Sequence, residues 1–149
     1  MFKKTIKNIK LIFFKKKSKM TTNWDEAVEF SFKNETKEAK VLSVYDGDTI
    51  TVAFPFGDKM FRWNCRLIGV DTPELRTRNK QEKEFGYQVR DNLRNRILKQ
   101  IVKLECGDFD KYGRLLVKVY KDDECMNDWL IDNGYAFVYD GGTKKKWFA

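Results

Sequence analysis

The chain has 149 residues, 42% of them hydrophobic, and a formal net charge of +8 at pH 7. This length and apolar content suit a single globular domain with a buried core. The absence of histidine excludes histidine general bases, Ser-His triads and histidine metal sites. Cys65, Cys106 and Cys125 form no Cys-x-x-Cys pair, which argues against a zinc site and indicates free thiols in a reducing compartment.

The first 20 residues carry the excess positive charge. They hold eight of the 30 basic residues and no acid, which leaves 22 basic against 22 acidic residues in the remainder. Apolar residues recur in this tail at helical spacing, at Phe2, Ile6, Ile9 and Phe13. Its longest apolar run, residues 11–14, is too short for a secretory signal or a membrane span, which indicates an intracellular protein. Two interpretations stay open: an amphipathic helix lying on an anionic membrane surface, or a basic arm attracted to nucleic acid.

Polar residues 21–39 predict a linker or a short helix capped by Asn23. Strand signals begin at Val41, and apolar alternation predicts three closely spaced strands ending at Leu67. The alternation breaks at Gly69, which predicts a bulge or a sharp bend.

Later segments alternate between helical and strand periods. Residues 75–83 are polar and predict a mobile loop, and apolar residues four apart predict a core-facing helix over 86–99. Further strands are expected over 101–106 and 115–120, and a short helix at about 126–130.

This order predicts an α+β protein with an OB-fold five-stranded β-barrel, a helix between strands 3 and 4, and a short later helix. The predicted organisation is a basic amphipathic tail over 1–20, a linker or short helix over 21–39, and the barrel domain over 40–149.

Carboxylates and arginines follow the ends of the predicted strands. Asp48 leaves one turn and Asp71 ends a strand, so both face one point if their strands are neighbours. Oxygen ligands without histidine or cysteine favour calcium or magnesium. Arg66 lies within an apolar strand, where a charge is costly unless it faces a site, and Arg114 can add donors to a phosphate. Glu74 is the natural general base.

Each feature also has a plainer interpretation. Asp46-Gly47 is a common turn sequence, the acids near Pro73 can be solvated, and either arginine can form a surface salt bridge of little energetic value. Combinations of motifs therefore carry more weight than any one of them.

Three segments together resemble the staphylococcal (micrococcal) nuclease family, also called thermonuclease-like proteins. They are Asp46-Gly47-Asp48-Thr49, the run from Arg66 to Glu74, and Asp110-Lys111-Tyr112-Gly113-Arg114. Their order and spacing are compatible with that family over about residues 40–139.

The resemblance implies an OB-fold endonuclease, a calcium-dependent hydrolase that cleaves the phosphodiester bonds of DNA and RNA with little sequence preference and leaves a 3′-phosphate. It implies that Asp48 and Asp71 bind Ca²⁺ and that Thr72 gives its backbone carbonyl. No obligate protein partner is implied.

The same resemblance implies catalytic roles for three residues. Arg66 and Arg114 would hold the phosphate and its growing charge, and Glu74 would activate the attacking water. The residues implied to contact the substrate are Lys111, Tyr112 and Tyr139. Relatives often continue into a further helix, so the short, lysine-rich end after Tyr139 predicts a less well covered core.

Two other functions stay open. One is a non-catalytic nucleic-acid-binding OB-fold module tethered by its basic tail, and the other is a calcium-binding interaction domain without a nucleic-acid partner. The presence of Arg66, Glu74 and Arg114 favours the enzyme.

Overall fold

The protein was analysed as a computed structural model, which describes residue 20 and residues 22–149. The chain divides into two compact units, the second of which runs from Ser31 to Ala149 and contains the barrel. The predicted amphipathic tail lies outside the described residues, apart from Met20.

The first unit contains a single turn of helix among its described residues. Asn23 caps the 3₁₀ helix η1 (Trp24–Glu26), because its side-chain oxygen accepts a hydrogen bond from the Asp25 N–H at 3.1 Å. The predicted cap is therefore confirmed.

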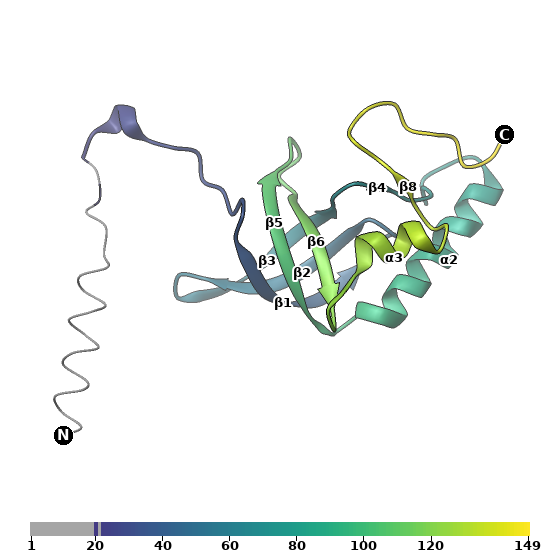
Figure 1. The fold of residues 1–149 in the computed structure, drawn as a ribbon, viewed down its shortest axis with the longest axis horizontal. Coiled ribbons are helices and arrows are strands. Elements are labelled where there is room, and N and C mark those ends of the chain that lie inside the picture. The colour runs from purple at the N-terminus through teal and green to yellow at the C-terminus, as the bar shows by residue number, and fades with distance from the viewer. Residues whose placement is uncertain (1–19, 21) are drawn as a thin grey trace, which may run out of the picture. The chain divides into compact units, whose positions relative to one another are not determined.

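Five long strands of the second unit close into a barrel (Figure 1). They are β1 (Thr36–Val44), β2 (Thr49–Phe56), β3 (Lys59–Leu67), β5 (Ile101–Phe109) and β6 (Leu115–Lys121). Neighbours pair antiparallel in the order β3-β2-β1-β5-β6, and β3 then pairs with β6 in parallel, with Arg66 opposite Leu116. This closed barrel confirms the predicted OB-fold and α+β class.

Strand β1 begins at Thr36, five residues before the predicted Val41. Its early residues alternate like the rest, with Ala39 buried between the exposed Glu38 and Lys40. The charged residues point outward, and the first buried residue is a small alanine, so this part of the strand has little hydrophobic signal in the sequence. This is why hydrophobic pattern alone placed the start too late.

Helix α2 (Lys80–Ile97) lies between the third and fourth barrel strands, as predicted, but begins earlier than expected. The Asn79 side chain accepts a hydrogen bond from the Glu82 N–H at 3.1 Å and so caps the first turn. The prediction of a mobile loop through residue 83 is therefore wrong from residue 80 onward. Lys99, with φ of 61°, lies just beyond the helix end.

Short elements complete the unit. The predicted later helix is α3 (Met126–Asp132), which follows the two-residue strand β7 (Glu124–Cys125). Strand β4 (Val70–Asp71) pairs antiparallel with β8 (Phe137–Val138), with Asp71 opposite Phe137. The described helices are all too short or too polar to span a membrane.

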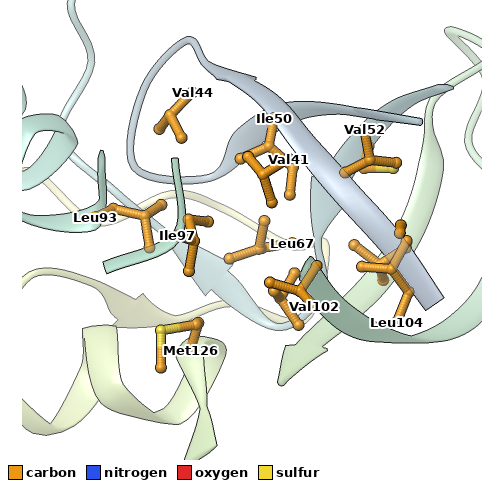
Figure 2. Close-up of a cluster of buried hydrophobic side chains, with 14 of the residues drawn as sticks. Val41, Val44, Ile50, Val52, Leu67, Leu93, Ile97, Val102, Leu104 and Met126 are labelled. Carbon is orange, nitrogen blue, oxygen red and sulfur yellow. The ribbon is translucent and has the colours of Figure 1, made fainter. Parts of the chain in front are cut away.

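Both helices contribute to one apolar core. Figure 2 shows Leu93 and Ile97 of α2 and Met126 of α3 beside the inward side chains of the strands, such as Leu67 and Val102.

All three cysteines are free, as predicted. Burial raises the pKa of the Cys65 thiol to about 12, so this residue packs as a neutral apolar group.

The C-terminal arm (residues 140–149) packs on the rest of the second unit through aromatic rings. Trp147 stacks on Phe137 with ring centroids 4.0 Å apart, and its ring centroid lies 5.4 Å from that of Phe85 on α2. These contacts cover part of the region that the lysine-rich end was expected to leave exposed.

Candidate functional site

The loop between β1 and β2 places Asp48 at the mouth of the barrel. The Asp46 side-chain oxygen accepts a hydrogen bond from the Asp48 N–H at 3.0 Å, which closes a tight turn. A Cβ on Gly47 would lie 2.7 Å from Cγ1 of Val89 and 2.8 Å from Cβ of Thr72. Glycine is therefore needed for the loop to approach helix α2 and residue 72 this closely.

Asp48 is held by neighbours on both sides. Its Oδ2 accepts a hydrogen bond from the Thr72 hydroxyl at 3.0 Å and lies 3.3 Å from Nη2 of Arg66. The Asp48 carbonyl also accepts from the Leu67 N–H at 2.9 Å, which ties the loop to strand β3. The carboxylate is thus buried but has partners of complementary charge and polarity.

Arg66 has a fixed orientation. Nη1 donates to the Leu67 carbonyl at 2.7 Å, and Nη2 donates to the Val70 carbonyl at 2.8 Å. The bend at Gly69, with φ of 77°, separates the residues that supply these two carbonyls. The side chain is 11% exposed, so the guanidinium is largely desolvated and locked to the barrel.

A second glycine lets the segment after β4 lie against helix α2. A Cβ on Gly86 would lie 2.9 Å from Cδ2 of Leu75, 3.0 Å from the Pro73 carbonyl oxygen and 3.2 Å from that of Glu74. The helix thus supports the backbone that carries Glu74, while the Glu74 side chain remains about half exposed.

Lys144 of the C-terminal arm lies against the carboxylates of this segment. Its Nζ is 3.3 Å from Oδ1 of Asp71 and 3.2 Å from Oε1 of Glu74. Burial alone would lower the pKa of Lys144, but the two carboxylates outweigh burial and raise it. Burial raises the pKa of Asp71, and Lys144 opposes this shift.

Asp46 is a buried carboxyl that the sequence interpretation treated as a turn residue. Its burial, followed by repulsion from Asp48, raises its pKa to about 7, and Glu74 adds to the shift. Only the folded structure brings these three acids together, so the sequence pattern held no signal beyond the Asp-Gly-Asp motif itself.

Arg114 is oriented by its own turn. Its Nε donates to Oδ2 of Asp110 at 2.8 Å, while Asp110 Oδ1 accepts from the Tyr112 and Arg114 N–H groups. Burial would raise the pKa of Asp110, but the hydrogen bonds from Arg114 and Tyr112 lower it overall. The turn therefore fixes one edge of the guanidinium and leaves the side chain 31% exposed.

Two hollows collect most of the predicted site residues. The central hollow has a volume of about 290 Å³, and Asp48, Arg66, Glu74 and Arg114 line it together with Asp46 and Lys144. A neighbouring space of about 460 Å³, here called the Tyr139 hollow, is lined by Arg66, Lys111, Tyr112, Arg114 and Tyr139. The two spaces meet at the two arginines.

Two predicted residues are not part of the lining of the central hollow. Asp71 and Thr72 are buried and do not line it, although Thr72 contacts Asp48 and Asp71 contacts Lys144. Lys144 was missed, because a lysine in a Lys-Lys-Lys run gives no sign of which member reaches a carboxylate 70 or more residues away.

The described residues contain no group of three or more histidine, cysteine, aspartate or glutamate side chains that could hold a metal ion as they stand. Asp48 is engaged by Arg66 and Thr72, and Asp71 and Glu74 share the Lys144 ammonium. The acids are therefore paired with cations that belong to the protein itself.

The chain resembles several curated proteins. It is 38% identical over 100 residues to "Thermonuclease" of Staphylococcus hyicus (65% of this chain, 56% of the relative) and 37% identical over 98 residues to "Thermonuclease" of Staphylococcus intermedius (64% and 56%). It is 36% identical over 122 residues to "Endonuclease YncB" of Bacillus subtilis (75% and 55%). The chain thus spans little more than half the length of these relatives.

A family model described as "Staphylococcal nuclease homologue" matches residues 64–147. The match contains Arg66, Asp71, Glu74 and Arg114 and begins after Asp48. It extends over more than half of the chain and agrees with the closed OB-fold barrel. The chain belongs to the staphylococcal nuclease homologue family.

Proposed function

We propose that this protein is a nuclease that hydrolyses phosphodiester bonds of DNA or RNA with little sequence preference. The observation that carries the proposal is that Glu74, Arg66 and Arg114 line one hollow. Family membership and the printed names of the relatives, thermonuclease and endonuclease, support an enzyme of the hydrolase class. The neighbouring Tyr139 hollow offers space for the nucleotide attached to the phosphate.

The two arginines bind and polarise the phosphate. Arg66 is preorganised by backbone carbonyls, and Arg114 by Asp110, so little reorganisation is needed when a phosphate enters between them. Guanidinium groups donate to phosphate oxygens in a planar fork and stay charged at all working pH values. They therefore stabilise the charge that grows as water attacks phosphorus.

Glu74 acts as the general base. It accepts a proton from the attacking water, the new P–O bond forms, and the bond from phosphorus to the leaving sugar oxygen breaks as that oxygen takes up a proton from solvent. Glu74 is about half exposed and its contact is the Lys144 ammonium, so the base is freed when Lys144 moves away.

The residues present fit a hard cation, and we propose calcium. Asp71 Oδ1 is buried and accepts no hydrogen bond from any described residue. The nearby Lys144 ammonium places a positive charge next to this oxygen, as a bound cation would. Asp48, Asp71 and the Thr72 carbonyl would hold the ion. When bound, it would supply positive charge that reduces repulsion between the phosphodiester and hydroxide.

Lys111, Tyr112 and Tyr139 are proposed as substrate contacts because they line the Tyr139 hollow. Tyr139 also has its backbone fixed, since its N–H donates to the Gly69 carbonyl at 2.9 Å. A contact of residues 1–20 with an anionic membrane remains a prediction on residues that, apart from Met20, lie outside the described part of the chain.

The test is cleavage of single-stranded DNA and RNA by the full chain, with Ca²⁺ or with a chelator. We expect cleavage in Ca²⁺ only, and a loss of at least about a hundredfold in Glu74→Gln. Glu38→Gln, at an exposed residue of β1, is the matched control and should retain activity. A folded wild type that binds nucleic acid in Ca²⁺ without cleaving it would contradict the proposal and favour the binding module.

A further inference from the structure

A third hollow, here called the basic hollow, lies beside the central one. Its volume is about 590 Å³, and it is lined by five basic residues, Arg76, Arg78, Lys83, Arg90 and Arg94. The other lining residues are two tyrosines, a leucine and a threonine, so no acid of the described chain faces this space. The mechanism proposed above uses none of these five basic residues.

The basic hollow is continuous with the site through shared walls. Tyr45, Leu75 and Arg76 line both the basic hollow and the central hollow. Arg66 and Arg114 line both the central hollow and the Tyr139 hollow. The three spaces therefore follow one another, with the proposed scissile position in the middle.

The basic residues fall into two groups. Arg94 donates through Nε and Nη2 to the Val44 carbonyl at 3.1 and 3.0 Å, and Arg90 pairs with Asp91 at 2.9 Å. These two arginines belong to the wall and fix its shape. In contrast, the exposed side chains of Arg76, Arg78 and Lys83 make no hydrogen bond or ion pair with any described residue.

Aromatic surface accompanies this charge. Tyr45 is 49% exposed and Tyr87 is 39% exposed, and the Arg90 guanidinium lies 4.6 Å from the Tyr87 ring centroid. Guanidinium and ammonium groups recognise phosphates, and exposed aromatic rings stack with unpaired bases. A ligand that carries both at regular intervals is a single-stranded nucleic acid.

We propose that the basic hollow binds the continuing strand of the substrate on the side of the scissile phosphate opposite the Tyr139 hollow. This inference rests on the proposed nuclease function and names single-stranded DNA or RNA as the substrate form that the surface fits. Arg78 and Lys83 bind backbone phosphates, and Tyr45 and Tyr87 contact bases.

The test compares a dinucleotide, whose single phosphate is the scissile one and leaves none for the basic hollow, with a single-stranded 12-mer. Arg78→Gln/Lys83→Gln removes two exposed charges, and Arg62→Gln/Lys118→Gln removes one exposed arginine and one exposed lysine elsewhere on the barrel. We expect kcat/KM on the 12-mer to fall about tenfold more than on the dinucleotide in the first variant. The control variant should show no such difference between the two substrates.

Binding gives a readout that does not depend on cleavage. In the Glu74→Gln background, affinity for the 12-mer is measured against salt concentration. The magnitude of the slope of log affinity against log salt should decrease by about 1.4 in Arg78→Gln/Lys83→Gln, because each of the two lost single-strand phosphate contacts contributes about 0.7. This separates the two proposals, since a wild type that cleaves nothing overturns the nuclease while the salt slope still tests the hollow.

Three outcomes would overturn the inference. The first is an equal loss on the 12-mer and the dinucleotide, and the second is an unchanged salt slope in the Arg78→Gln/Lys83→Gln variant. The third is an equal loss of affinity for a 12-base-pair duplex, which would show that the surface does not select the single strand.

Discussion

Arg66 and Lys144 both bring a positive charge to the carboxylates near the central hollow, but from different parts of the molecule. Arg66 belongs to barrel strand β3, is 11% exposed and donates to two backbone carbonyls as well as facing Asp48. Lys144 belongs to the C-terminal arm, and its side chain is 48% exposed. The barrel thus supplies a fixed charge, which we propose binds phosphate, and the arm supplies an exposed charge, which we propose is displaced.

The largest effect should come from removing the fixed charge of Arg66. Arg66→Ala leaves the Asp48 carboxylate buried without its cationic partner, so we expect the free energy of unfolding to fall by about 3–5 kcal/mol. Chemical denaturation measures this change. Arg62→Ala, at an exposed residue of the same strand, is the control and should cost less than about 0.5 kcal/mol. Equal losses in the two variants would show that Arg66 is not locked to the barrel.

The buried acid Asp46 predicts a pH dependence of stability in the metal-free protein. The pKa of Asp46 is about 7 in the folded state against an ordinary 3.8, so the folded state binds more protons between these values. The free energy of unfolding should therefore fall as pH rises from about 4 to about 7, by up to about 4 kcal/mol.

Asp46→Asn isolates this contribution. Its side-chain oxygen can still accept the hydrogen bond from the Asp48 N–H, while the titrating charge is gone. Denaturation in chelator at pH 5 and pH 8 should give a smaller difference for the variant than for the wild type. Parallel pH profiles for the two proteins would refute the assigned shift.

The smallest effect should come from removing the displaceable charge. Lys144→Gln frees Asp71 and Glu74 from the ammonium, so we expect Ca²⁺ to bind about fivefold more tightly, as suits partly exposed ion pairs. Titration calorimetry measures the affinity. Lys146→Gln changes net charge equally at an exposed position of the same arm and should leave the affinity unchanged. Equal shifts in both variants would mean that net charge, not position, is responsible.

Most of the barrel could be predicted from local pattern, because alternation in β2 and β3 and helical spacing in α2 report directly which faces are buried. The motifs around Asp48, Arg66 and Arg114 likewise predicted residues that line adjoining hollows. The hydrophobic pattern was too weak to predict two element starts. One is the start of β1, where charged residues lie outward, and the other is the start of α2, which the Asn79 cap sets.

Contacts between distant segments could not be predicted. The position of Lys144 depends on Trp147 stacking against Phe137, and the burial of Asp46 depends on the fit of Gly47 against α2. The basic hollow likewise combines residues from the β1 end, the segment after β4 and one face of α2. Such arrangements follow from the closed fold and leave no periodic signal in the chain.

The most direct test of the account is to measure both turnover and binding in Arg114→Ala. Because Arg114 is proposed to stabilise the growing charge of the transition state, turnover of single-stranded DNA in Ca²⁺ should fall about a hundredfold. Its Kd for the same DNA should change by no more than about threefold. A comparable loss in turnover and in binding would contradict the account and make Arg114 a binding residue only.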